Sequence, residues 1–271
     1  MTARPDTLAA LKDALARIEP RAMPSALPHF PLGLASLDGP LGGGLTLGAI
    51  HEVFAASPSD GPAATGFALA LAMRAAPAAR LVWVRQRMVD VEFGRPHGPG
   101  LASLGLDPGR IVLVRADDAA AAVRAARDAA RAGILGAVVV EFWGEPKVLD
   151  LTASRRLSLT SSETGVTVLI VRIGAEPAPS AAASRWEVRA APSRPLEAGA
   201  PGHAVFSITL LRHRAGLPPR QCLVEWDRDQ CRFRDGSPLS RRLDAVPAGR
   251  KAAPVGKPVE AGEVVGLRRA G

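Results

Sequence analysis

Short apolar stretches alternate with helical patterns through the middle of this chain, and this alternation restricts the fold more than any other feature. The stretches "AVVVEF" (137–142) and "VTVLIV" (166–171) are almost continuously apolar. Strands of this kind are buried on both faces, as is typical of parallel sheets connected by helices. We therefore expect an α/β fold with a doubly wound, mostly parallel sheet.

The expected elements follow one another in a regular order. We expect strands over 49–54, 80–85, 110–115, 137–142 and 166–172, and helices over 64–76, 119–131 and 150–163. Beyond Gly174 the chain becomes rich in Ala, Pro, Ser and Gly, which indicates a loop and then a brief edge strand around Trp186 and Val188. The stretches "AVFSITLLRHR", "QCLVEWD" and "CRFRD" then predict a C-terminal antiparallel extension of the same sheet.

Three regions are expected from composition. Residues 1–30 hold a short amphipathic helix (6–18) and a Pro-rich linker, residues 31–235 form the core, and residues 236–271 form a basic tail without periodicity that we expect to be disordered. The two cysteines show no metal-ligand spacing, so neither a metal site nor a disulfide framework is expected. Because no long apolar run occurs, we expect a cytoplasmic protein without a membrane span.

The stretch "FAASPSDGPAATGFALALA" (54–72) stands where a nucleotide-binding protein carries its phosphate loop. A working loop ends in Gly-Lys-Ser/Thr, in which the Lys contacts phosphates and the hydroxyl ligates magnesium. Here the frame runs from Ala56 to Gly61, and then Pro62 and Ala63 replace the Lys and the hydroxyl. A carboxylate such as that of Asp60, about 4 Å from a phosphate charge, adds a repulsion of ~4 kcal/mol. We expect neither a nucleotide cofactor nor a metal here.

The same residues fit a structural role. Ser59 or Asp60 is expected to cap the following helix, with Pro62 in its first turn. A weak anion site at the helix N-terminus stays open as an alternative.

Hydrolysis also needs acidic partners at the ends of neighbouring strands. Glu141 follows "AVVV", but the strand "LVWV" ends in Arg85, Gln86 and Arg87, with no acid before Asp90. A lone Glu in this position indicates a structural or interface residue, so no catalytic residue is expected.

The order of these motifs resembles a RecA-type recombinase core, which has a similar lead-in to "LDGPLGGGL". More narrowly, "GLASLDGPLGGGLTLGAIHEV", "GPAATGFALALA", "LTASRRL" and "SAAASRWEV", followed by "LLRHRAG" and "CLVEWD", resemble the bacterial ImuA family of inducible-mutagenesis proteins. The match spans roughly residues 30–235. It implies a role in SOS-controlled, error-prone translesion synthesis, with three partners: an inactive Y-family polymerase homologue (ImuB), an error-prone replicative-type DNA polymerase and RecA.

The resemblance also shows what this chain lacks. Pro62 stands where RecA has its Lys, Ala63 stands where RecA has a Thr, and the segment in place of RecA's mobile DNA-binding loop has no basic residue before Arg185. The net charge of +8 still suggests an acidic partner, and direct DNA contact stays open. The candidates for partner or DNA contact are Arg155, Arg156, Arg185, Trp186, Arg212 and Arg214.

Three functions are compatible with this pattern. The first is a non-catalytic accessory protein that uses a RecA-like scaffold for protein contacts, since packing of the sheet does not require the loop Lys. The second is a cell-division inhibitor similar to SulA, and the third is an atypical RecA-type, DNA-dependent ATPase.

Overall fold

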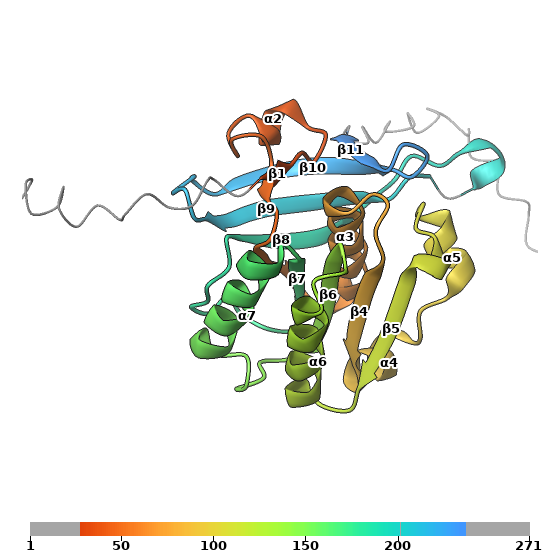
Figure 1. Ribbon diagram of the computed structural model, residues 1–271. Coiled ribbons are helices and arrows are strands. Elements are labelled where there is room, and N and C mark those ends of the chain that lie inside the picture. Colours follow the sequence, from red (N-terminus) through yellow and green to blue (C-terminus); the bar gives the residue numbers. More distant parts are fainter. Residues whose placement is uncertain (1–27, 201, 237–271) are drawn as a thin grey trace, which may run out of the picture. The chain divides into compact units, whose positions relative to one another are not determined.

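A single sheet organises the part of the chain that the computed structural model describes, residues 28–200 and 202–236 (Figure 1). Its strand order is β11-β10-β9-β8-β3-β7-β6-β4-β5. Six neighbouring strands are parallel: β8 (Ser184–Ala191), β3 (Ile50–Ala55), β7 (Thr167–Ile173), β6 (Ala137–Trp143), β4 (Leu81–Gln86) and β5 (Ile111–Ala116). The antiparallel strands are β9 (Val205–His213), β10 (Arg220–Asp227) and β11 (Arg232–Asp235). The expected fold class, consistent with a RecA-like fold, is confirmed.

Helices cover both faces of the parallel strands. The helix α3 (Gly61–Ala75) packs on one face, and α6 (Ala119–Arg131) and α7 (Leu151–Thr164) pack together on the other (Figure 1). Every residue of β3 and β7 is buried, as the apolar sequences of the strands predict. Burial of both sheet faces supplies most of the driving force for folding.

Local signals explain where the helices begin and end. Asp118 and Asp150 accept hydrogen bonds from the backbone N–H groups of Ala121 and Ala153, each at 2.7 Å, and so cap α6 and α7. Gly165 closes α7 in the left-handed conformation (φ 76°), which glycine adopts without strain.

The strand around Trp186 is not an edge strand, contrary to the sequence prediction. It is β8, and it lies between β3 and β9 because the antiparallel extension continues the sheet beyond it. Trp186 is fully buried and its ring packs against that of Phe67 on α3, with 6.0 Å between ring centroids.

Two helices between β4 and β5 have no counterpart among the predicted elements. They are α4 (Arg87–Phe93) and α5 (Gly98–Ser103), and a 3₁₀ turn (Pro108–Arg110) follows them. Helices this short, in a segment rich in Gly and Pro, do not produce a readable apolar period. The lead-in to the core likewise contains a short helix, α2 (Ala35–Asp38), and a pair of two-residue strands, β1 (His29–Phe30) and β2 (Leu45–Thr46).

Two sequence predictions lie outside the described residues: the N-terminal helix over 6–18 and the disordered tail, apart from its first residue, Gly236. Within the described residues, none of the helices combines the length and apolar character needed to cross a lipid bilayer.

Candidate functional site

The loop between β3 and α3 occupies the position of a phosphate loop at the carboxyl end of the parallel strands. In a working loop, backbone N–H groups point at the phosphates. Here the N–H of Ala56 donates to the carbonyl of Val188 (3.0 Å) and that of Asp60 to the carbonyl of Ser57 (3.0 Å). The N–H of Gly61 donates to the carbonyl of Pro58, within a 3₁₀ turn.

Proline accounts for two further positions in the same loop, because Pro58 and Pro62 have no N–H to donate. Five of the seven residues from 56 to 62 therefore cannot offer a free backbone donor to an anion. These positions add to the missing Lys, and the loss of phosphate binding stays a prediction.

Asp60 occupies the N-cap position of α3, as predicted, but its side chain makes no capping hydrogen bond to the helix. One carboxylate oxygen of Asp60 accepts the N–H of Ala190 on β8 at 2.9 Å, and the other accepts the hydroxyl of Ser57 at 2.7 Å. The hydroxyl of Ser59 pairs with that of Ser57 at 2.8 Å. Asp60 thus ties the loop to a strand 130 residues later in the sequence.

An aromatic ring covers the start of α3. A Cβ atom added to Gly61 would lie 2.6 Å from Cζ of Phe93 and 3.3 Å from Cγ2 of Ile173. Phe93, the last residue of α4, packs on Trp143 with 5.8 Å between ring centroids. The N–H of Trp143 in turn donates to Oε1 of Gln86 (3.0 Å). We call the loop 56–60 together with Gly61 and Phe93 the closed end of α3.

Buried ion pairs occupy the strand ends beside the closed end. Nε of Arg85 donates to Oε2 of Glu141 at 2.7 Å, and the same guanidinium contacts Asp90 and the carbonyl of Gly94 (3.0 Å). Asp90 also accepts from Nε of Arg115 at 2.7 Å. Glu141 and Asp90, the two acids considered as partners for hydrolysis, are thus both paired with arginines.

Glu141 is fully buried, and its Oε1 has no hydrogen-bond partner among the described residues. Burial raises the pKa of Glu141, and the charge of Arg85 opposes that rise. Burial and the ion pair with Arg85 fit a structural role for Glu141, and that role stays a prediction.

A second buried ion-pair network lies in the amino-terminal half of β3, around Glu52. One oxygen of Glu52 accepts from Nε of Arg185 (2.8 Å) and from the hydroxyl of Ser180 (2.7 Å), and Arg172 lies 3.8 Å from the other. Through Ser180, this network contacts the segment between β7 and β8. Arg185 is 9% exposed and Trp186 0%, so the idea of an exposed Arg–Trp pair at these positions is wrong.

The other predicted contact residues are exposed. Arg155 and Arg156 project from α7, Arg212 is near the end of β9, and Arg214 follows that strand. Nη2 of Arg214 reaches the carbonyl of Ala181 at 3.5 Å. A binding role for these four residues stays a prediction.

A candidate metal cluster lies at the turn between β10 and β11. His203, Asp227 and Asp229 each offer a ligand atom, and these atoms lie within 4.8 Å of one another. However, Oδ1 of Asp227 already accepts the N–H groups of Asp229 and Gln230, each at 3.1 Å. The arrangement is explained by the turn itself.

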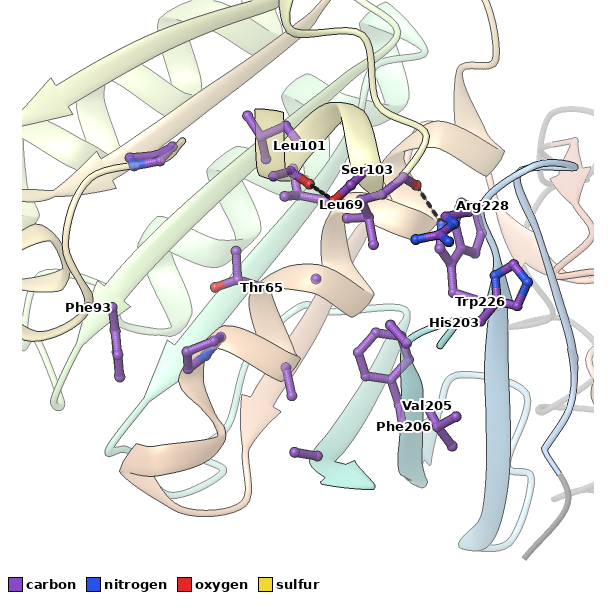
Figure 2. Close-up of a pocket in the computed structure, with 18 of the residues that line it drawn as sticks. Thr65, Leu69, Phe93, Leu101, Ser103, His203, Val205, Phe206, Trp226 and Arg228 are labelled. Atoms are coloured by element: carbon purple, nitrogen blue, oxygen red, sulfur yellow. Dashed lines mark hydrogen bonds between the residues drawn. The ribbon is translucent and has the colours of Figure 1, made fainter. Parts of the chain in front are cut away.

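A cavity of about 600 Å³ lies along the flank of α3. Thr65 and Leu69 of α3 contribute to its lining, with Leu101 and Ser103 of α5 on one side and Phe206 of β9 and Trp226 of β10 on the other (Figure 2). We call it the α3 groove. Sequence analysis missed it, because α5 was not predicted and the lining comes from segments far apart in the chain.

Comparison with known proteins gives a consistent result. No protein-family model matches the chain. Two curated proteins, each named "Protein ImuA" and taken from two strains of Caulobacter vibrioides, are 33% identical to it over 211 residues. These residues cover 70% of this chain and 81% of each relative.

Proposed function

This chain belongs to the ImuA family, and from that premise we propose that it acts in damage-inducible mutagenesis as a non-catalytic accessory protein. Its work would be to hold other proteins of error-prone translesion synthesis in contact with one another. The partners proposed are an ImuB-type inactive polymerase homologue, an error-prone replicative-type DNA polymerase and RecA.

The closed end of α3 is the observation that carries the non-catalytic part of the proposal. Phosphoryl transfer requires phosphate-binding donors, a metal and a group that orients the attacking water. In this chain three loop donors are used internally and two loop positions are proline, Ala63 cannot ligate a metal, and Arg85 stands at the end of β4. The sheet and α3 pack without any of these functions, so the scaffold stays available for binding.

A complementation experiment tests the biological role. In a host strain that lacks this gene, the wild-type chain should restore ultraviolet-induced mutagenesis, scored as the frequency of drug-resistant colonies. The chain should also co-purify with the ImuB-type protein from damaged cells. Failure to restore mutagenesis by a chain that is expressed at a normal level would contradict the proposal.

A turnover assay tests the non-catalytic mechanism. The purified full chain, incubated with ATP, magnesium and single-stranded DNA, should release phosphate no faster than a blank. DNA-stimulated release that disappears on Gly61→Val would instead support an atypical ATPase. Filamentous growth on overexpression, with binding to the tubulin-like division protein, would support the SulA-like alternative.

A further inference from the structure

The α3 groove has the dimensions of a ligand site but no chemistry for catalysis. Its volume, about 600 Å³, falls within the range of pockets that enclose small ligands or side chains of a partner. Along its floor α3 presents small residues, Ala63 and Gly66, which leave the helix backbone close to the surface. Half-buried Leu101 and Leu104 add apolar surface from the α5 segment.

The charged side chains that line this groove are basic, and the carboxylates of Asp227 and Asp229 lie beside His203 at its edge. Its lining includes Arg85, Arg95, Arg228 and His203, and contains neither Asp nor Glu. Arg85 is committed to Glu141 and Asp90. The side chains of Arg95 and Arg228 have no ion-pair or hydrogen-bond partner within residues 28–200 and 202–236, and each is at least partly exposed. The groove therefore offers two free guanidinium groups beside apolar surface.

Nucleic acid fits this surface poorly. Binding of single strands relies on exposed aromatic faces that stack on bases and on a basic track along the backbone. The aromatic rings of Trp83, Phe206 and Trp226 are at most 4% exposed, and half-buried Phe93 already packs on Trp143. Two free arginines are also few for a phosphate track. Carboxylates beside aliphatic or aromatic side chains complement the groove better, because guanidinium groups pair with carboxylates in a bidentate geometry.

We propose that the α3 groove binds a short segment of a partner protein in which acidic residues flank apolar side chains. The apolar side chains enter between α3, α5 and β9, and the carboxylates pair with Arg95 and Arg228. This inference rests on the proposed function, since an adaptor needs such a surface, and it specifies the chemistry of one partner contact.

A binding assay on the full chain tests the proposal. The probe is a fluorescein-labelled peptide in which Asp alternates with Leu and Phe, and its binding is followed by fluorescence anisotropy. Two controls are the same peptide with every Asp changed to Lys and a labelled oligothymidylate. We expect saturable binding of the acidic peptide, and binding at least about tenfold weaker for the Lys peptide, since like charges disfavour association.

Charge variants locate the site. Arg95→Glu combined with Arg228→Glu should weaken binding of the acidic peptide by about tenfold or more. The matched control, Arg124→Glu with Arg131→Glu, changes the same charge on exposed residues of α6 across the sheet and should alter binding less than about twofold. Equal loss in the two double variants would overturn the proposal, and so would equal binding of the Lys peptide or tighter binding of the oligothymidylate.

A steric variant provides a test independent of charge. Gly66→Phe should fill the groove and abolish binding, whereas Gly66→Ala should preserve it, because an added Cβ there makes only an ordinary contact of 3.6 Å with Phe206. Circular dichroism shows whether each variant is folded. If Gly66→Phe does not fold, the charge variants alone decide whether the groove binds the peptide. The Arg95 and Arg228 double variant also separates this inference from the proposed function. If it lost peptide binding yet restored mutagenesis in full, the groove would not contribute to mutagenesis, and the proposed function of the chain would be unaffected.

Discussion

The closed end of α3 and the groove along its flank differ, although they share one helix. At the closed end, three backbone N–H groups are bonded within the protein, a ring covers Gly61, and acids and arginines neutralise one another. Along the flank, the surface is open and apolar, and two arginines have no partner among the described residues. The groove lining reaches Pro62 and Ala63, so the two regions adjoin at the first turn of α3. Under the proposals above, one end of this helix has lost phosphate binding while its flank binds a partner.

The largest expected effect comes from breaking the closed end at Arg85. Arg85→Ala leaves the buried carboxylate of Glu141 without its partner, and we expect a loss of about 3–5 kcal/mol in the free energy of unfolding. Urea denaturation followed by circular dichroism measures it. The exposed control Arg156→Ala should lose less than about 0.5 kcal/mol. Similar losses in both variants would show that the buried pair does not hold this end.

The next effect concerns β3, the strand that leads into the closed end. Nε2 of His51 lies 2.9 Å from the carbonyl of Thr46, and Nδ1 lies 2.8 Å from the hydroxyl of Ser184, a pattern that suits neutral imidazole. Burial lowers the pKa of His51 from 6.5 to about 4. The unfolded chain therefore binds a proton first as the pH falls, and stability is lost from pH 6.5 downward until the loss levels off near pH 4.

The loss of stability from His51 should total about 3 kcal/mol. Urea titrations at several pH values, repeated on His51→Gln, measure it, since Gln does not titrate but can still donate to Thr46. The wild-type chain should show a steeper fall in unfolding free energy over this pH window. Parallel curves for the two proteins would contradict a neutral, buried His51.

Two glycines of α3 compare the closed end with the groove directly. Gly61→Ala should cost about 1 kcal/mol, because the new methyl group must displace the ring of Phe93 from Trp143. Gly66→Ala should instead gain up to about 1 kcal/mol from helix propensity, since its new methyl group meets open space and Phe206 at contact distance. Thermal and urea unfolding show whether each variant is more or less stable than the wild-type chain. Stability changes of the same sign in both variants would contradict the contrast between the two glycine positions.

Sequence reasoning succeeded where signals are local. The bounds of α6 were predicted correctly, because an Asp cap precedes an apolar face repeated through Ala122, Ala126 and Ala130. Pro62 and Ala63 likewise show directly in the sequence that the Lys and the hydroxyl of a phosphate loop are missing, and the absence of nucleotide binding that this implies stays a prediction. These features depend on residues a few positions apart.

The closure of the site depends on residues far apart, and sequence reasoning missed it. Arg85 and Glu141 are separated by 56 residues, and the Asp60 side chain bonds a strand 130 residues away. Phe93 reaches Gly61 only because the short helix α4 folds back over the end of α3. Burial of Trp186 similarly follows from the antiparallel strands added beyond β8.

The most direct test of the central claim is a calorimetric titration of the intact chain with magnesium and ATP. Because five of the seven residues from 56 to 62 offer no free backbone donor and Phe93 covers Gly61, we predict no saturable heat of binding at ATP concentrations up to the millimolar range. The variant carrying Pro62→Lys and Ala63→Thr should not bind either, since those changes leave Phe93 and the 3₁₀ turn in place. Saturable micromolar binding by the wild-type chain, lost on Gly61→Val, would contradict the account.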